Sequence, residues 1–302
     1  MAVYNLLRDG AVHIVFGGNR YNVKVTPDLS FNQTFAEEAY SVKTLHDQTK
    51  MFQGTSITKA NPADFNFAVH LTKEKDESIV LDLLTDYESN SGGEQLKSFD
   101  IYFVTAESTF KVEGCILTDG EFTLNKSEPL TLTVNGKGKK LTRVGNASFS
   151  IPGNLQSPSA TRTPVRALLD VEVGGSDVTN LVTATLSVQN NINWTPYETL
   201  QNSLSVTDAS NAMYPTSYTI NDRVVSGNIT QFLTSDNSST FQTFNTNTSV
   251  AVKTLDSGST FFNANLSNCM FTKRTEANEI FTQTFDYRLV TSPADLGSII
   301  TY

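Results

Sequence analysis

The sequence predicts a mainly β protein made of two tandem antiparallel β-sandwich or half-barrel domains, each with a short helix. Two observations support this prediction. A chain of 302 residues has room for two domains of about 150 residues each, and one β-rich pattern occurs twice along it. We therefore expect a first domain over residues 1–150, a linker over 151–164 and a second domain over 165–302.

The repeat is visible in two pairs of segments. Segment 109–135 corresponds to segment 260–286, with the same offset of 151 residues at both ends. Upstream, segment 66–72 corresponds to segment 228–234 at an offset of 162 residues, so the order is kept and only loop length changes. A repeat of this length is a whole domain, because solenoid and propeller repeats have periods of roughly 20–50 residues.

The first half opens with a predicted hairpin. Strands over His13–Phe16 and Arg20–Val25 flank Gly17-Gly18-Asn19, whose residues tolerate the positive φ of tight turns. The stretch Phe35–Tyr40 is a weak helix candidate, and Asn135-Gly136-Lys137-Gly138 is expected to be a turn. Further strands are expected over 65–71, 79–84, 96–104, 110–116 and 130–134.

The second half repeats this pattern after a connector. Three prolines and the lack of apolar periodicity mark residues 146–164 as the connector. A strand over 165–173 is followed by a turn at Gly174-Gly175-Ser176-Asp177. Further strands are expected over 183–188, 224–233, 249–255, 261–271 and 280–290. Apolar and polar residues alternate in both halves, so each sheet should have one buried and one wet face.

Charge and composition exclude several classes of function. The net charge of −9 and the pI of about 4.9 argue against nucleic acid or anionic membranes as the driving partner. No segment has the roughly 20 apolar residues of a membrane span, so no membrane anchor is expected. The first residues lack the basic start and apolar run of a secretory signal, so we expect folding in a cytoplasm.

No catalytic or metal-binding motif is recognisable. The histidines His13, His46 and His70 lack the spacing of a zinc site, and no nucleophile elbow or phosphate-binding loop occurs. The sequence therefore predicts neither an enzyme nor a bound cofactor or metal. We expect Cys115 and Cys269 to be buried free thiols, because a reducing compartment disfavours a disulfide between them.

Three possible binding sites stay open, each beside a more ordinary structural explanation. Carboxylates between Asp76 and Glu88 could bind Ca²⁺, although their spacing misses the usual ligand pattern and a solvated acidic loop is favoured. Segment 136–138 could form an anion-binding nest, with a solvated turn favoured. An aromatic group could form a sugar-stacking platform, although such residues more often belong to the core. Its members are Trp194, Tyr197 and Tyr214.

A tandem of similar β domains that is acidic, catalytically blank and made in a cytoplasm resembles the tail tube protein of long-tailed bacteriophages, in the version that carries the tube domain twice. The resemblance rests on the architecture and the repeat. It implies that neighbouring chains close into a ring-shaped β-barrel, and that rings stack into a hollow tube through which DNA passes. It also implies a virion protein made in the bacterial host cytoplasm. A trimer with pseudo-sixfold symmetry is favoured over a hexamer, and sheath, tape-measure, baseplate or terminator proteins are the implied partners.

Stacked rings need a segment that reaches the next ring. Long segments without strong secondary structure are usually functional, and the candidates are Ala36–Ala60, its counterpart Tyr197–Tyr218 and the apolar C-terminus. The residues predicted to contact other subunits or rings are Phe35, Tyr40, Leu45, Met51, Phe52, Trp194, Tyr197, Leu200, Tyr214, Ile299, Ile300 and Tyr302. Two rival functions remain open: a related ring protein of a baseplate, tail terminator or secretion-system tube, and a carbohydrate- or receptor-binding sandwich.

Overall fold

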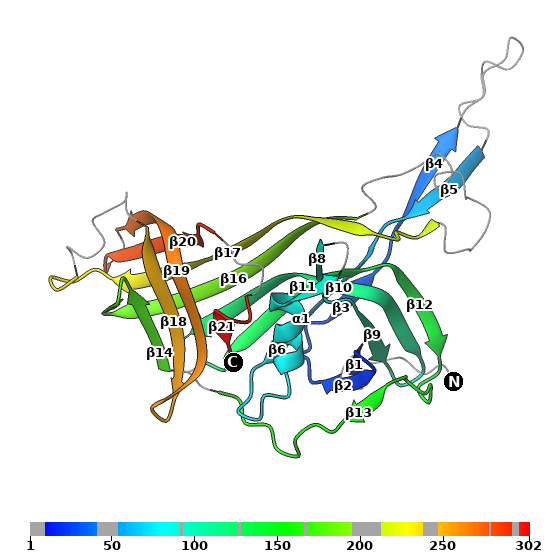
Figure 1. Cartoon of the computed structure of the whole chain (residues 1–302), viewed down its shortest axis with the longest axis horizontal. Coiled ribbons are helices and arrows are strands. Elements are labelled where there is room, and N and C mark those ends of the chain that lie inside the picture. The colour runs from blue at the N-terminus through cyan, green and yellow to red at the C-terminus, as the bar shows by residue number, and fades with distance from the viewer. Residues whose placement is uncertain are drawn as a thin grey trace, which may run out of the picture.

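The protein is mainly β, as the sequence predicts, and long strands run across its two halves (Figure 1). The computed structural model describes residues 10–40, 54–90, 93–125, 128–165, 168–194, 213–237, 247–277, 279–291 and 296–302. Among these residues one α-helix is present, α1 (Ser78–Thr85). Below, the first half means residues 1–150 and the second half means residues 165–302.

One antiparallel sheet, which we call the long sheet, passes through both halves. Its strands follow the order β3 (Ser30–Asn32), β6 (Ala63–His70), β11 (Thr131–Gly138), β10 (Thr109–Asn125), β16 (Leu181–Trp194), β17 (Tyr218–Phe232), β20 (Thr282–Leu289) and β19 (Ser259–Glu276). The halves meet where β10 pairs with β16, with Phe122 opposite Leu186.

A second layer packs against the long sheet in each half. The first part of β10 leaves the long sheet and pairs with strands of the second layer, which are β12 (Lys140–Gly145), β9 (Phe99–Val104), β1 (Ala11–Phe16), β2 (Asn19–Val23) and the parallel strand β13 (Asn154–Gln156). In the second half the first part of β19 does the same, with β18 (Thr248–Asp256), β14 (Leu168–Val173), β15 (Ser176–Asp177) and β21 (Ile300–Thr301).

Two hairpins stand apart from these layers. Strands β4 (Phe35–Tyr40) and β5 (Gly54–Ala60) form the hairpin that we call the arm. Figure 1 shows the arm projecting away from the body of the molecule. The second hairpin consists of β7 (Tyr87–Asn90) and β8 (Gly93–Leu96).

Strand registers correspond between the halves. In the first half Asn66 lies opposite Asn135, and in the second half Asn228 lies opposite Asp286. The first residues of these pairs are 162 positions apart and the second residues are 151 apart, which are the two offsets found in the sequence. Equivalent positions of the sequence repeat therefore occupy equivalent positions in the sheet.

The predicted hairpin at Gly17-Gly18 and the predicted turn at Gly174-Gly175 are confirmed, although Ser176 and Asp177, expected to belong to that turn, form strand β15. The first, β1–β2, turns at Gly17-Gly18 and the second, β14–β15, turns at Gly174-Gly175. All four glycines have positive φ, with values of 57° and 78° in the first turn and 61° and 78° in the second. Glycine adopts such angles at little cost, so the glycine pairs suit both turns.

A single hydrophobic core extends through both halves. Phe122 of the first half and Phe262 of the second half are fully buried, and their ring centroids are 4.8 Å apart. Cys115 and Cys269 are buried free thiols, as predicted. Burial raises the pKa of Cys269 to about 11 and also raises the pKa of Cys115, so both thiols stay protonated and unreactive at neutral pH.

The predicted strand over 79–84 is wrong, because this segment forms helix α1. A short apolar run fits a buried strand and a buried helix equally well, so periodicity alone cannot distinguish them. The helix lies directly on β10 at Gly120, where a Cβ atom would be 2.2 Å from the Leu84 side chain. The close approach that Gly120 permits gives the helix its place on the sheet.

Two other local predictions are also wrong. The weak helix candidate Phe35–Tyr40 is strand β4 of the arm. Residues 135–138, predicted to be a turn, lie within strand β11. At Gly136 a Cβ atom would be 2.2 Å from the Phe65 ring, so this glycine makes room for a neighbour and does not turn the chain.

Candidate functional site

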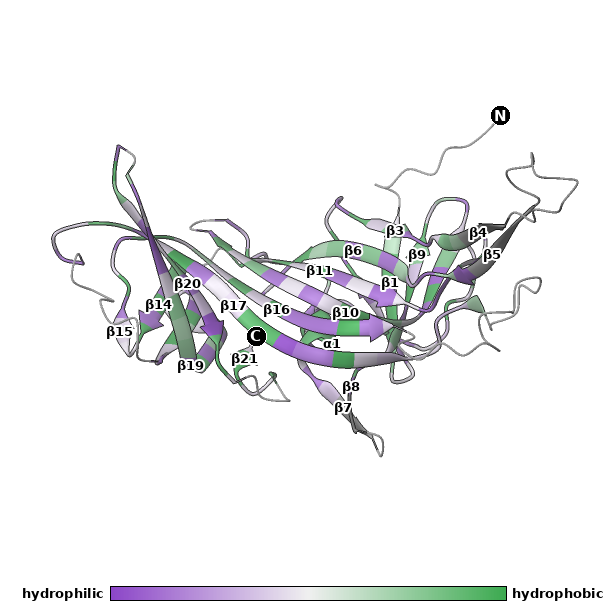
Figure 2. Cartoon of the chain, turned by 90° about the horizontal axis from the view of Figure 1, so that it is seen from above, coloured by the Kyte–Doolittle hydropathy of each residue, from purple (hydrophilic) through white to green (hydrophobic). Residues whose placement is uncertain are grey.

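The long sheet has two faces of opposite character, and rows of side chains continue across the junction between the halves. One row joins Thr133, Glu121, Ser187, Ser226 and Arg288, each opposite the next on neighbouring strands. All of these residues are exposed or half-buried. We call this side of the sheet the polar face. Figure 2 shows the alternation of hydrophilic and hydrophobic residues along β10, β11, β16 and β17.

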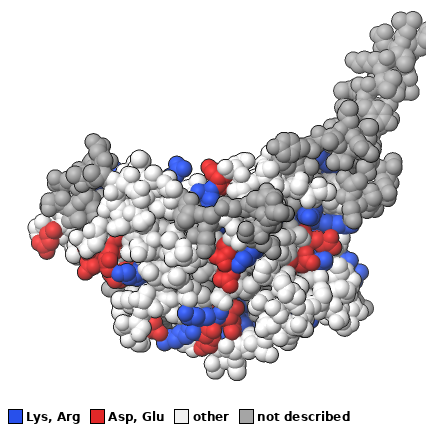
Figure 3. Space-filling model, viewed as in Figure 1, with Lys and Arg blue, Asp and Glu red and all other residues white. Residues whose placement is uncertain are grey.

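The polar face carries mainly hydroxyl and amide groups. A parallel row consists of Thr131, Thr123, Thr185, Asn228 and Asp286. These groups bind water and carry no charge except at Asp286, which pairs with Arg274 at 3.2 Å. On the side of the molecule seen in Figure 3, acidic and basic side chains are interspersed. The cations Arg274 and Lys137 on this face are paired with Asp286 and Asp64, which leaves few cations to hold a polyanion.

The opposite face of the long sheet is buried. Residues Val69, Leu132, Phe122 and Leu186 form a row that crosses from β6 to β16, and all four are almost completely buried. Because this row and the polar rows both pass through the β10–β16 pair, the junction has the same pleat as the rest of the sheet. The two halves thus form one continuous wall with a wet side and a dry side.

Arg223 of β17 ties the second half to helix α1. Its guanidinium donates hydrogen bonds to the carbonyl oxygens of Leu84 (3.0 Å) and Thr85 (2.9 Å), which lie at the C-terminal end of the helix. It also donates to Oδ1 of the buried Asn190 at 2.6 Å and stacks on the Tyr87 ring at 4.2 Å. A cation at this end of a helix also complements the helix dipole. Sequence patterns gave no sign of this contact, because its partners are far apart in the chain.

The linker is fastened to the first half by polar contacts. Arg162 forms an ion pair with the buried Glu77 at 3.1 Å. The Ser159 backbone N–H and hydroxyl both donate to the carboxylate of Asp76, at 2.9 and 3.0 Å. The acidic residues considered for Ca²⁺ binding thus include two that bind the linker. Strand β13 within the linker also pairs with β2, so the linker follows the surface of the first half closely.

The C-terminus packs within its own chain. Ile300 is 1% exposed, and β21 pairs with β19. The Tyr302 hydroxyl donates to the Thr72 carbonyl at 2.7 Å and accepts from the Thr72 backbone N–H at 2.9 Å. Burial is the main cause that raises the pKa of Tyr302. Contact of Ile299, Ile300 and Tyr302 with other subunits stays a prediction.

The other predicted contact residues lie in or near the arm and the far ends of β16 and β17. Phe35 begins the arm and is 46% exposed. The Trp194 ring contacts Tyr218 at 5.3 Å, and Lys140 lies 4.7 Å from the Tyr214 ring centroid. For Tyr40 the structure describes only the backbone. The predicted residues Leu45, Met51, Phe52, Tyr197 and Leu200 lie outside the described residues. The contact roles of all these residues remain predictions.

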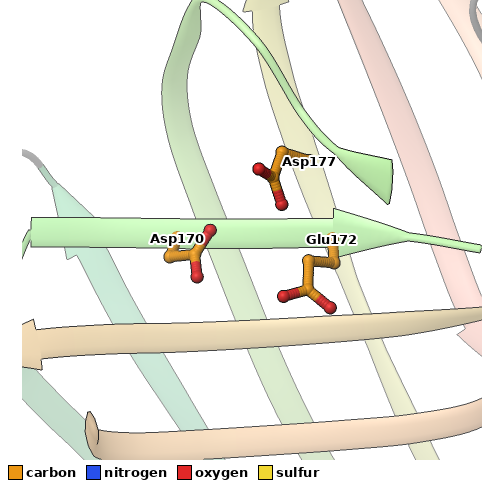
Figure 4. Close-up of side chains that lie close together, drawn as sticks. All are labelled: Asp170, Glu172 and Asp177. Atoms are coloured by element: carbon orange, nitrogen blue, oxygen red, sulfur yellow. The ribbon is translucent and has the colours of Figure 1, made fainter. Parts of the chain in front are cut away.

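One group of carboxylates among the described residues has the spacing of a cation site. Oxygen atoms of Asp170, Glu172 and Asp177 lie within 4.8 Å of one another on the β14–β15 hairpin (Figure 4). Glu172 is already paired with Lys253 of β18, which neutralises part of the charge. Hydrogen bonding to Glu172 is the main cause that raises the pKa of Lys253. Exposed acidic groups of this kind are common on protein surfaces.

Comparison with known proteins assigns the chain to a family. The sequence model of the Bacteriophage Baseplate Tube Protein Family matches residues 2–301. No curated protein matches the chain. The described residues contain no helix with the length and apolar character of a membrane span.

Proposed function

The chain belongs to the bacteriophage baseplate tube protein family, and from that premise we propose that it forms the wall of a tube through which phage DNA leaves the particle. The observation that supports this proposal best is the continuous long sheet with one polar and one buried face. A sheet of this kind can close with copies of itself into a barrel, which leaves the polar face toward the lumen.

We further propose that the halves are tandem copies of one tube domain. The matching registers at Asn66–Asn135 and Asn228–Asp286 support this, as do the matching hairpin turns. If each half supplies one sixth of the ring, three chains close it with pseudo-sixfold symmetry. The β10–β16 pair is then an interface between adjacent domains that has become internal to the chain.

The polar face should let DNA slide because it offers few cations to the phosphates. We expect Glu121→Lys to leave ring assembly intact and to slow DNA release from particles, since Glu121 is exposed on this face. The control Glu121→Gln removes the negative charge without adding a cation and should change release much less. The measurement is the rate of DNA ejection from particles that carry each variant. An unchanged rate in the lysine variant contradicts the proposed lining.

The arm is the proposed contact between stacked rings. Shortening segment 36–60 should leave single rings and abolish their stacking, because the arm projects beyond the body of the chain. Negative-stain microscopy of the concentrated protein distinguishes the two outcomes. Tubes of normal length from the shortened protein would rule out this role for the arm.

A second candidate function is a single ring of the baseplate rather than a long tube, and the family description favours it. The same closed sheet serves both functions, and only the extent of stacking differs. Indefinite tubes from purified protein support the tail tube, whereas closed single rings support the baseplate ring. In either case we propose assembly with other tail or baseplate proteins of the virion.

A further inference from the structure

The long sheet ends in two edges that no strand among the described residues covers. One is the outer edge of β3, whose inner edge pairs with β6. The other is the outer edge of β19 over residues 272–276, whose inner edge pairs with β20. Open edges expose unpaired backbone N–H and C=O groups and invite pairing with another strand. The two edges lie at opposite ends of one sheet, which suits a head-to-tail ring of identical chains.

The two edge strands, β3 and the end of β19, correspond to β16 and β10, the two strands of the internal junction between the halves. Ser30 of β3 lies opposite Asn66, as Thr185 of β16 lies opposite the equivalent residue Asn228. In this sense β3 corresponds to β16. Ser30 and Thr185 are equivalent because their partners, Asn66 and Asn228, are equivalent in the sequence repeat.

The end of β19 corresponds in the same way to the end of β10. Glu276 of β19 lies opposite Thr282, and Thr123 of β10 lies opposite Thr131. Thr131 and Thr282 are 151 residues apart, the offset of the sequence repeat. The internal junction places Thr123 opposite Thr185.

We propose that β19 of one chain pairs with β3 of a second copy in the register of the internal β10–β16 junction. Glu276 then lies opposite Ser30 of the second copy, and Arg274 lies opposite its Asn32. The inference rests on the proposed ring and specifies how its chains join. The junction between chains is thus a copy of the junction within each chain.

The side-chain faces agree with this register. Ser30, Asn32, Arg274 and Glu276 are all exposed, and the register places them together on the polar face. Phe31, between the two β3 residues, points to the other side and stacks on Phe103 at 4.3 Å in the core. The polar face and the buried face therefore both continue from one chain to the next without a break.

Charged side chains lie at both edges. The end of β19 carries Lys273 and Arg274, where β10 has Gly120 and Glu121. Beside β3, Asp64 lies opposite Asn32 on β6 and pairs with Lys137 of β11 at 3.3 Å. Charged side chains on an edge strand also oppose indiscriminate pairing. Arg274 already pairs with Asp286 of β20, and Glu276 lies further along β19, so the charges at these edges are largely balanced within the chain.

A cysteine pair tests the proposed register. In the double variant Asn32→Cys/Arg274→Cys, mild oxidation of assembled protein should link chains, because directly opposite residues have Cβ atoms about 4.5–5.5 Å apart. Non-reducing gels should show species of two and three chains. The matched control Asn32→Cys/Thr272→Cys is displaced by two residues, to about 7–8 Å, and should link far less. The positive control Glu121→Cys/Ser187→Cys spans the internal junction and should form a link within one chain.

Electron microscopy of the same samples distinguishes a failure of the proposed register from a failure of the proposed ring. Rings together with the Asn32–Arg274 link support the inference. Rings with no link, or with stronger linking in the displaced control, overturn the proposed register and leave the ring itself standing. Protein that stays monomeric while the internal control links normally contradicts both the register and the proposed function.

Discussion

The variant Phe122→Ala is expected to lower the free energy of unfolding by about 3–5 kcal/mol. Phe122 is fully buried at the internal junction, where its ring contacts Phe262 of the other half at 4.8 Å. Alanine leaves a cavity in a region that strands of both halves hold in place, so the surroundings can collapse only partly. The loss should also weaken the packing of one half against the other.

Urea unfolding measured by fluorescence and by circular dichroism tests this expectation. Both probes should report one transition for the wild type, because the core is shared between the halves. The control Phe281→Ala removes a side chain that is 51% exposed and should change stability much less. A cost for Phe122→Ala no larger than that of the control would show that the halves do not depend on this contact.

The variant Arg223→Ala should lower the free energy of unfolding by about 2–4 kcal/mol, because hydrogen bonds to charged groups contribute roughly 1.5–3 kcal/mol each and the buried Oδ1 of Asn190 loses its donor. Oδ1 of Asn190 loses its donor, and the carbonyl oxygens of Leu84 and Thr85 keep only longer bonds, from Asn190 Nδ2 at 3.4 Å and from the Leu296 N–H at 3.3 Å. The alkyl part of Arg223 also packs against neighbouring groups, so part of the cost comes from lost contact area.

Two controls separate the hydrogen bonds from the charge. Arg223→Lys keeps the charge but cannot reproduce the fork of donors, so most of the loss should remain. Arg288→Ala removes an exposed cation from the polar face and should have little effect. Hydrogen exchange at the end of α1 should increase in Arg223→Ala. Unchanged stability and exchange in this variant would mean that Arg223 does not hold the helix.

Sequence patterns predicted the strands of the long sheet well, because alternation along β10, β11 and β20 reflects burial on one side only. The hairpin turns were equally clear, since adjacent glycines between two strand patterns are typical of a tight turn. Patterns failed for α1, because its five apolar residues form a short run whose spacing does not distinguish a helix from a strand. They also failed at Gly136, where the glycine accommodates the Phe65 ring.

The contacts that fasten the second half and the linker to the first half were beyond sequence reasoning. Arg223 and Glu77 are ordinary charged residues in the sequence, and their roles depend on partners such as Thr85 and Arg162 that folding brings near. The polar face, in contrast, was predictable as a wet face, because threonines and asparagines alternate with the core residues. Its continuity across both halves depends on the β10–β16 pairing, which no local pattern encodes.

Electron cryomicroscopy of the concentrated protein tests the central claim most directly. We expect closed rings of three chains with pseudo-sixfold symmetry, in which the polar face of the long sheet lines an open lumen. A single chain that stays monomeric, or a ring whose lumen is lined by the second layer around β1 and β14, would contradict the account.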